Sequence, residues 1–156
     1  MIAMLRATTT VLLALPLLFL SSCLDPCKDV SCQNGGECND GNCDCPAGFE
    51  GSDCSEAARD KFIGTFVVSE TCNSGANSYE LTISPGSDDT QIFIRNLYDL
   101  NRSFEARIDG SDLTIHPQTI DFATLSGTGT HNGTSLNISL SIVIGDNVDQ
   151  CTIWGN

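Results

Sequence analysis

The sequence predicts a mainly β protein in which a small disulfide-rich module precedes an eight-stranded antiparallel meander barrel. Three observations lead to this fold class. Six cysteines fall within residues 27–54, apolar and polar residues alternate from residue 62 onward, and turn pairs such as Asp109-Gly110 separate the alternating runs. Alternation with a period of two is typical of strands with one buried face, and Asp-Gly favours tight hairpin turns. A β-sandwich is the alternative, because its sheets also have one polar face each.

Residues 1–22 have the parts of a secretory signal peptide. Arg6 is their only charged residue, and residues 11–20 form a run of ten apolar residues followed by two serines. A membrane-spanning helix needs about 20 apolar residues, so this run predicts a signal peptide instead. Its end, Leu20-Ser21-Ser22-Cys23, resembles the lipobox of bacterial lipoproteins. The resemblance implies that acyl chains such as palmitate are attached to Cys23, and that residues 23–26 form the anchor segment. An ordinary secreted protein with an unpaired Cys23 is the alternative.

The cysteine count agrees with a special role for Cys23. Nine cysteines are an odd number for an exported chain, in which disulfides are the default. Setting Cys23 aside leaves an even number that can pair. Metal binding is not expected, because the sequence contains no Cys-x-x-Cys pair. The cysteines predicted to form disulfides are Cys27, Cys32, Cys38, Cys43, Cys45, Cys54, Cys72 and Cys151.

The charge of the chain excludes two kinds of partner. Cys23 is followed by all twenty acidic residues and by six of the seven basic residues, so the mature chain has a net charge of −14. Such a surface repels nucleic acid and anionic lipid headgroups. We therefore expect no nucleic-acid partner, and we expect the lipid on Cys23 to make the membrane contact. Two or three acyl chains suffice for stable attachment.

The cysteines of residues 27–54 have the spacing C-x4-C-x5-C-x4-C-x-C-x8-C. Together with Asn34-Gly35-Gly36 and the run Cys43-Asp44-Cys45-Pro46-Ala47-Gly48-Phe49-Glu50-Gly51, this spacing resembles the EGF-like family. The residues alone leave fifteen pairings open. A segment with Phe49 as its one large apolar side chain cannot build a sufficient core, so it depends on such bridges. The resemblance implies the pairs Cys27–Cys38, Cys32–Cys43 and Cys45–Cys54.

The module departs from the family at the short gap between Cys38 and Cys43, which predicts a compact hairpin with a two-residue turn at Asp40-Gly41. Calcium-binding members carry an acidic cluster before the first cysteine, whereas here only Leu24-Asp25-Pro26 separates Cys23 from Cys27. We therefore expect neither calcium nor another cofactor. The module is interpreted as a rigid spacer, with a protein-binding face as the alternative.

Residues 55–61 are predicted to be a short linker with one or two helical turns, and residues 62–156 to be the barrel domain. Turns are expected at Pro85-Gly86, Asp109-Gly110, 131–133 and 145–147, where glycine, asparagine and aspartate gather. The predicted strands are Phe62 to Glu70, Ser78 to Ser84, Gln91 to Tyr98, Arg102 to Asp109, Asp112 to Pro117, Ala123 to Thr130, Ser135 to Ile144 and Val148 to Trp154.

Alternation also assigns the inner face of these strands, and it leaves mostly hydroxyl, amide and charged side chains outside. Cys72 follows the first strand and Cys151 lies in the last, so a bridge between them would hold these strands side by side, as closure of a barrel requires. The predicted inner residues are Phe62, Phe66, Val68, Tyr79, Leu81, Ile83, Ile92, Ile94, Phe104, Ile108, Leu113, Ile115, Leu125, Leu136, Ile138, Leu140 and Ile142.

The barrel domain begins with the sequence Lys61-Phe62-Ile63-Gly64-Thr65-Phe66. This start resembles the Gly-x-Trp motif of lipocalin-like domains, with Phe66 at the tryptophan position. The last strand lacks the arginine that family members place over that tryptophan. The resemblance implies an apolar ligand pocket, which we expect near Phe66, Tyr79, Gly127 and Gly129. The bulky inner residues instead favour a filled interior, in which case the two glycines mark a bend.

The sequence contains no Gly-x-Ser-x-Gly, His-Glu-x-x-His or glycine-rich phosphate motif. His116 and His131 are expected to be solvated turn residues. We therefore predict a non-enzymatic protein whose barrel binds a protein or glycan partner, as in adhesion. Leu24 is not the aspartate that retains some lipoproteins in the inner membrane, which favours the bacterial outer membrane, at its periplasmic face or at the cell surface. A lipocalin-like carrier of a small hydrophobic molecule is the alternative function.

Overall fold

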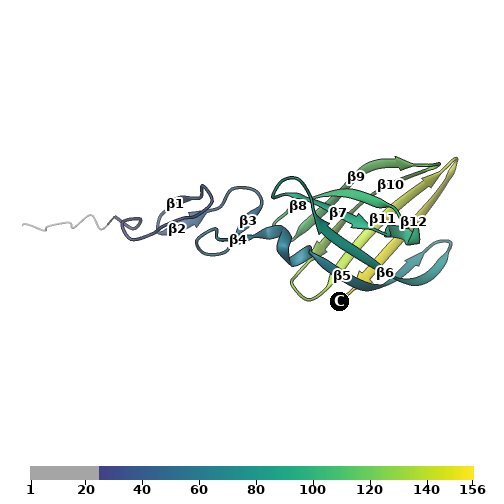
Figure 1. Ribbon diagram of the computed structural model, residues 1–156, viewed down its shortest axis with the longest axis horizontal. Helices are drawn as coiled ribbons and strands as arrows, with labels where there is room; N and C mark the ends of the chain where they lie inside the picture. Colours follow the sequence, from purple (N-terminus) through teal and green to yellow (C-terminus); the bar gives the residue numbers. More distant parts are fainter. Residues whose placement is uncertain (1–24) are drawn as a thin grey trace, which may run out of the picture.

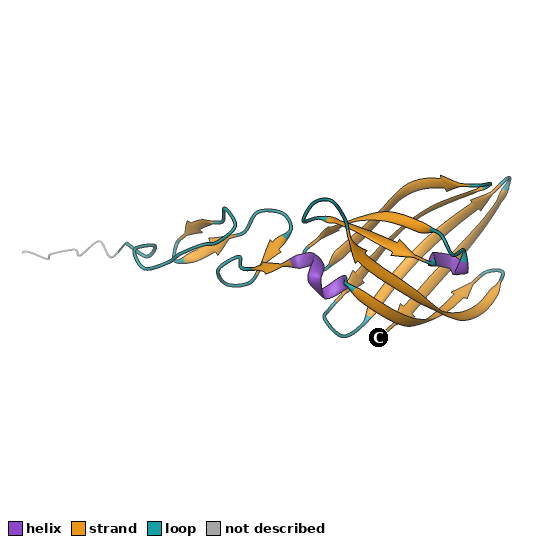
Figure 2. Cartoon of the chain, in the orientation of Figure 1, coloured by secondary structure: helices purple, strands orange, loops and turns teal. Residues whose placement is uncertain are grey.

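The computed structural model describes residues 25–156. The predicted signal peptide and the lipidation of Cys23 lie outside the described residues. A narrow N-terminal module projects from one end of a β-barrel (Figure 1), and nearly all regular structure is strand (Figure 2). The fold is therefore mainly β, as predicted.

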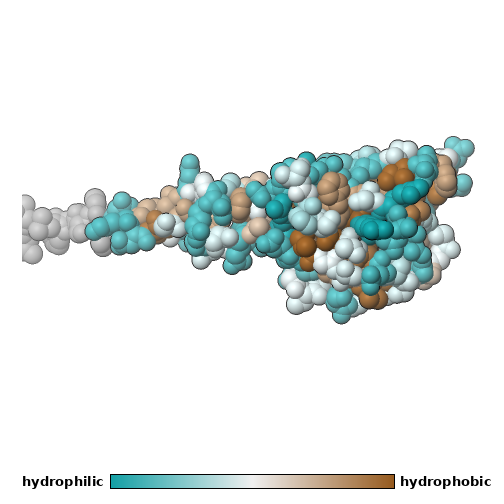
Figure 3. Space-filling view, viewed as in Figure 1, coloured by the Kyte–Doolittle hydropathy of each residue, from teal (hydrophilic) through white to brown (hydrophobic). Residues whose placement is uncertain are grey.

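The N-terminal module is held together by disulfides in place of a core. Gly48 and Cys54 are its only buried residues within 25–57, and Figure 3 shows mainly hydrophilic and intermediate surface on it. Its bridges are Cys27–Cys38, Cys32–Cys43 and Cys45–Cys54, the pairing that the resemblance implied. Each closes a short loop and so restricts the unfolded chain.

Two small hairpins make up the regular structure of this module. β1 (Glu37–Asn39) pairs with β2 (Asn42–Asp44), and β3 (Phe49–Glu50) pairs with β4 (Glu56–Ala57). The first hairpin turns through Asp40 and Gly41, with φ of 52° and 88°. A two-residue loop with positive φ at both positions matches the strand twist and favours Asp-Gly. The compact turn predicted for the short cysteine gap is therefore present.

A 3₁₀ helix, η1 (Ala58–Phe62), connects the module to the barrel. It begins where the backbone N–H of Ala58 donates to the carbonyl of Gly48 at 2.9 Å. Phe62 is fully buried and belongs to the core of the barrel. The first strand was predicted to begin at Phe62, but it begins at Gly64, because Phe62 enters the core from this helix.

Eight antiparallel strands form the closed barrel, and each hairpin joins neighbours. The strands are β5 (Gly64–Cys72), β6 (Gly75–Pro85), β7 (Gln91–Arg95), β8 (Ser103–Asp109), β9 (Asp112–Ile120), β10 (Ala123–His131), β11 (Leu136–Ile144) and β12 (Asn147–Gly155). A second 3₁₀ helix, η2 (Leu97–Asp99), lies between β7 and β8. The barrel closes where β12 pairs with β5, with Cys151 opposite Cys72 and a disulfide between them. This is the predicted barrel and not the alternative sandwich.

The interior of the barrel is filled with apolar side chains. Every predicted inner residue is buried except Tyr79, which is half-buried. Leu97 of η2 and Ile153 of β12 add to the same core. An eight-stranded barrel encloses little more than its own side chains when these are large, which accounts for the filled interior.

Gly127 and Gly129 mark a bend and do not leave open space inside the barrel. The pairing of β9 with β10 shifts register between Leu125 and Gly127. A Cβ atom at Gly127 would lie 2.5 Å from the carbonyl oxygen of Ser139, and one at Gly129 would lie 2.5 Å from that of Asn137. Any side chain would therefore push β10 away from β11. The glycines permit a close approach of two strands at a bulge.

Candidate functional site

One half of the outer barrel surface carries no charged side chain. It belongs to β10, β11, β12 and β5, which are neighbours in the barrel. Along each of these strands, outward positions alternate with the buried ones. We call these outward residues the neutral face: Thr124, Ser126, Thr128, Thr130, Asn137, Ser139, Ser141, Val143, Val148, Gln150, Thr152, Trp154, Thr65, Val67, Ser69 and Thr71.

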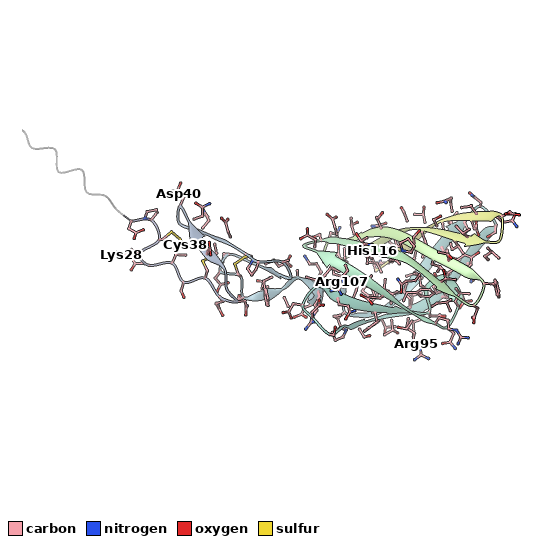
Figure 4. All side chains as sticks on the ribbon, turned by 90° about the horizontal axis from the view of Figure 1, so that it is seen from above. Lys28, Cys38, Asp40, Arg95, Arg107 and His116 are labelled. Atoms are coloured by element: carbon pink, nitrogen blue, oxygen red, sulfur yellow. A yellow bond between two sulfur atoms is a disulfide. The ribbon has the colours of Figure 1, made fainter. Side chains whose placement is uncertain are left out.

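The opposite half of the barrel is charged. Its outward residues include Glu80 on β6, Arg95 on β7, and Glu105 and Arg107 on β8; Figure 4 labels the two arginines. Arg107 Nη1 lies 2.7 Å from Asp88 Oδ2, and this hydrogen-bonded pairing lowers the pKa of the Asp88 carboxyl to about 2. Because the chain as a whole has a formal net charge of −13, the absence of charge from the outward positions of four adjacent strands is a local property and not a reflection of composition.

Two adjoining shallow hollows lie where the neutral face meets β9. The first, of about 420 Å³, lies over β9, β10 and β11, and the second, of about 380 Å³, continues toward β12. Thr114, Thr128 and Ser139 border both, so the two form one groove across the strands. Asp112 at one rim is the only charged residue that lines it. Hydroxyl, amide and glycine residues provide most of the remaining lining, which suits hydrogen bonding to an uncharged ligand.

Trp154 stands at the side of this groove. It lies opposite Asn137 in the pairing of β11 with β12, and Asn137 lines the first hollow. Trp154 is 47% exposed, although tryptophan is among the residues that gain most from burial. An exposed indole beside the groove offers a flat apolar surface to a bound molecule.

Many polar groups of the neutral face are free to bind a ligand. Within residues 25–156, the side chains of Thr128, Thr130, Asn137, Ser139 and Thr152 make no hydrogen bond to another protein group. Elsewhere on the face such bonds do form, as between Gln150 Nε2 and Ser141 Oγ at 2.9 Å. The groove therefore presents donors and acceptors that water satisfies until a ligand replaces it.

The structure does not gather the four predicted pocket residues around one space. Gly127 and Gly129 line the groove on the outer surface. Phe66 and Tyr79 line neither of its hollows. Phe66 is buried in the core, and Tyr79 is half-buried and bonded to a carboxylate near the barrel opening.

A polar cluster that the sequence analysis missed lies at the barrel opening beside η2. Tyr79 Oη donates to Glu70 Oε2 at 2.7 Å and accepts from the backbone N–H of Tyr98 at 3.0 Å. Tyr98 Oη donates to Asp149 Oδ2 at 2.9 Å. Glu70 is only 4% exposed, and burial raises the pKa of its carboxyl, with smaller contributions from the charges of Asp149 and Asp99. The sequence could have indicated that Glu70 is buried, because it lies two residues beyond the inward Val68 in an alternating strand.

The surroundings of Glu70 do not amount to a metal centre. Its carboxylate lies within 4.8 Å of the sulfurs of Cys72 and Cys151. Those two sulfurs are bonded to each other, and a cysteine binds metal as a thiolate. The hollow at this opening, of about 250 Å³, is lined largely by polar groups from Ser74, Asn77 and Tyr98 together with Glu70.

The prediction that His131 is solvated is wrong. His131 is 4% exposed, and its ring centroid lies 5.5 Å from that of Phe62 and 5.6 Å from that of Phe66. Its Nδ1 accepts the backbone N–H of Gly133 at 3.0 Å. Burial, with the nearby charge of Lys61, lowers the pKa of the imidazole. His131 points inward because it lies an even number of residues after the buried Leu125 on β10. His116 is exposed, as predicted. Neither imidazole is hydrogen-bonded to a nucleophile or carboxylate within residues 25–156.

Comparisons of the chain with protein-family models, with curated proteins and with solved structures found no match. Within the part of the chain that the structure describes, no helix has the length and apolar character needed to cross a membrane. The assignment of function therefore depends on the surface itself.

Proposed function

We propose that this chain is an exported, lipid-anchored and non-enzymatic binding protein, in which an EGF-like spacer carries a lipocalin-like barrel that binds a protein or glycan on its outer surface. The neutral face is the observation that carries the proposal. Charged side chains are depleted where a partner covers a protein surface. Here the outward positions of four neighbouring strands lack them in a chain with twenty acidic residues.

The EGF-like part of the proposal is supported by the disulfide pairing and by the short hairpin at Asp40-Gly41. The spacer role is supported by contacts with the barrel. Lys61 Nζ lies 2.6 Å from Glu50 Oε2 of the module and 3.3 Å from Ser111 Oγ of the barrel. Such contacts would hold the barrel at a fixed distance from the anchor.

The filled interior supports binding on the outside of the barrel in preference to carriage of a small hydrophobic molecule. The core side chains occupy the space in which a lipocalin-like carrier holds its ligand, and the opening beside Glu70 is polar. Native mass spectrometry of protein from its own host distinguishes the two functions. A small apolar molecule that co-purifies with it would support the carrier instead.

The proposed anchor is Cys23, with the outer membrane as the proposed location. Cys23→Ser should release the protein from the membrane fraction or block its processing, while the four disulfides remain intact. Protease treatment of intact cells distinguishes the two sides of the membrane, since a protein on the cell surface loses its barrel and a periplasmic one keeps it.

The proposed binding surface is tested by photocrosslinking in the cells that produce the protein. A benzophenone amino acid replaces Ser139 on the neutral face or, as the matched control, Ser84 on β6, which is also an exposed serine on an outer strand face. We expect a specific crosslinked product from position 139 and none from position 84. Identical products from both positions, or none from 139, would contradict the proposed surface.

A further inference from the structure

We infer that the partner of the neutral face is an uncharged polysaccharide. The inference rests on the proposed function, because it names the class of partner that the same surface binds. It follows from the charge, the hydrogen-bonding groups, the tryptophan and the shape of the groove.

The composition of the face favours a glycan over a protein. Serine is depleted at protein interfaces, and serine, threonine and valine are rare among the residues that dominate protein binding energy. Those types make up most of the neutral face, and the groove around Thr128 and Ser139 has neither arginine nor methionine. A protein partner would find few anchoring residues here.

Charge selects among glycans. Acidic polysaccharides are repelled by a chain with a net charge of −13, and no basic side chain stands on the neutral face to offset that repulsion. A neutral polymer is not repelled, and it has no ionic groups that must give up their hydration when it binds. The chemistry of the face therefore fits sugars that carry hydroxyl groups alone.

The free hydroxyl and amide groups form a regular array. Outward residues repeat about 7 Å apart along a strand, and adjacent strands are about 4.8 Å apart. Thr128 and Thr130 of β10 thus stand beside Ser139 and Asn137 of β11, their partners in the sheet register. A sugar ring has several hydroxyl groups that both donate and accept, so it can bond to several members of such an array at once.

Trp154 supplies the apolar contact that a sugar also needs. The face of an indole ring carries partial negative charge, which attracts the weakly positive C–H groups on one side of a sugar ring. Trp154 lies opposite Asn137, so a sugar stacked on the indole would be next to the groove. The two hollows, about 420 and 380 Å³, are shallow and adjoin each other, so one extended polymer would lie across both with consecutive sugar rings.

Trp154 also provides a direct test, because it is the only tryptophan in the chain. The purified full chain is titrated with dextran, laminarin, mannan and xyloglucan, and with alginate as an acidic polymer, while its tryptophan fluorescence is recorded. Affinity electrophoresis in gels that contain each polymer measures binding independently. We expect at least one uncharged polymer to change the fluorescence and to retard the protein, and alginate to do neither.

Variants then locate the binding. Measured by affinity electrophoresis, which needs no tryptophan, Trp154→Ala and Ser139→Arg should each raise the Kd about tenfold, through loss of stacking and through obstruction of the groove. Ser84→Arg on β6 should leave the Kd within about twofold. Trp154→Phe, which retains an aromatic ring, should recover part of the affinity. Unfolding curves of all variants show whether each is folded.

The inference is overturned if none of the uncharged polymers binds, or if binding is unaffected by Trp154→Ala and Ser139→Arg. The proposed function is tested separately by the crosslink at position 139. If a protein is captured at position 139 and no polymer changes the fluorescence, the proposed binding surface stands but its partner is a protein and not a glycan. Failure of both assays would reject the surface itself.

Discussion

Cys72 and Cys151 lie directly opposite each other where the last barrel strand pairs with the first, and a disulfide joins them at that register. Every other neighbouring pair of strands in the barrel is consecutive in the chain and is connected by a hairpin or short loop. The bridge therefore stands at the one junction that the chain order does not itself bring together.

Removal of this bridge should strongly destabilise the barrel. The cysteines are 79 residues apart, and on the chain-entropy model a loop of that length restricts the unfolded state by about 4.5 kcal/mol. We expect Cys72→Ala with Cys151→Ala to lower the free energy of unfolding by about that amount in urea denaturation. Thr71→Ala with Thr152→Ala, the adjacent pair in the same register, is the matched control. A loss no larger than that of the control would show that strand pairing alone closes the barrel.

Gly127 should not tolerate even a methyl group. A Cβ atom there would meet the carbonyl oxygen of Ser139 at 2.5 Å, so β10 and β11 would have to separate. We expect Gly127→Ala to lower the free energy of unfolding by about 1–3 kcal/mol, the usual cost of overpacking. Thr128→Ala, an outward change on the same strand, should cost less than about 0.5 kcal/mol. Equal costs would mean that the bulge relaxes without loss.

His131 should make stability depend on pH. Its folded-state pKa is lowered, so the unfolded chain binds more protons, and stability falls as the pH drops through the ordinary histidine value of about 6.5. His131→Asn keeps an acceptor for the Gly133 N–H and removes the titrating group. Urea unfolding between about pH 7.5 and pH 5.5 should therefore show a smaller decrease for this variant. His116→Asn, which removes the other histidine, should lose as much stability at low pH as the parent protein. If it does not, the pH dependence does not come from His131.

Glu70 should make the protein less stable as the pH rises, the opposite of the effect of His131. Its folded-state pKa is raised, so stability declines as the pH rises through the ordinary glutamate value of about 4.3 and on through the raised one. Glu70→Gln keeps an oxygen that accepts from Tyr79 but carries no charge. We expect this variant to be more stable than the parent at about pH 7, with the difference vanishing near pH 4. Glu80→Gln on the outer face of β6 is the control. A Glu70→Gln variant that is less stable at neutral pH would show that the charge of Glu70 is needed there.

The barrel was predictable because its alternating pattern is local, whereas the candidate site is not. Period-two alternation assigned residues such as Leu125 and Ile142 to the core, and Asp-Gly placed hairpin turns. The same reasoning failed at His131, which was assigned to the turn before Asn132-Gly133, because β10 extends one residue further and places His131 at an inward position. The neutral face could not be foreseen from any single strand. It exists because closure sets β12 beside β5, so outward residues that are far apart in the sequence become neighbours.

Lys61 should determine how firmly the N-terminal module is fixed to the barrel. Joined domains move independently unless their interface is substantial. Here the Lys61 ammonium bridges Glu50 of the module and Ser111 of the barrel, and Arg59 adds a bond to the carbonyl of Asp88. ¹⁵N relaxation should give the two parts one common tumbling time in the parent protein. We expect Lys61→Ala to separate the two tumbling times, because the bridge is lost while η1 still connects the parts. Lys28→Ala removes an exposed cation of the module and should leave them equal. Separate tumbling already in the parent protein would show a flexible tether, and the module would then not hold the neutral face at a fixed height.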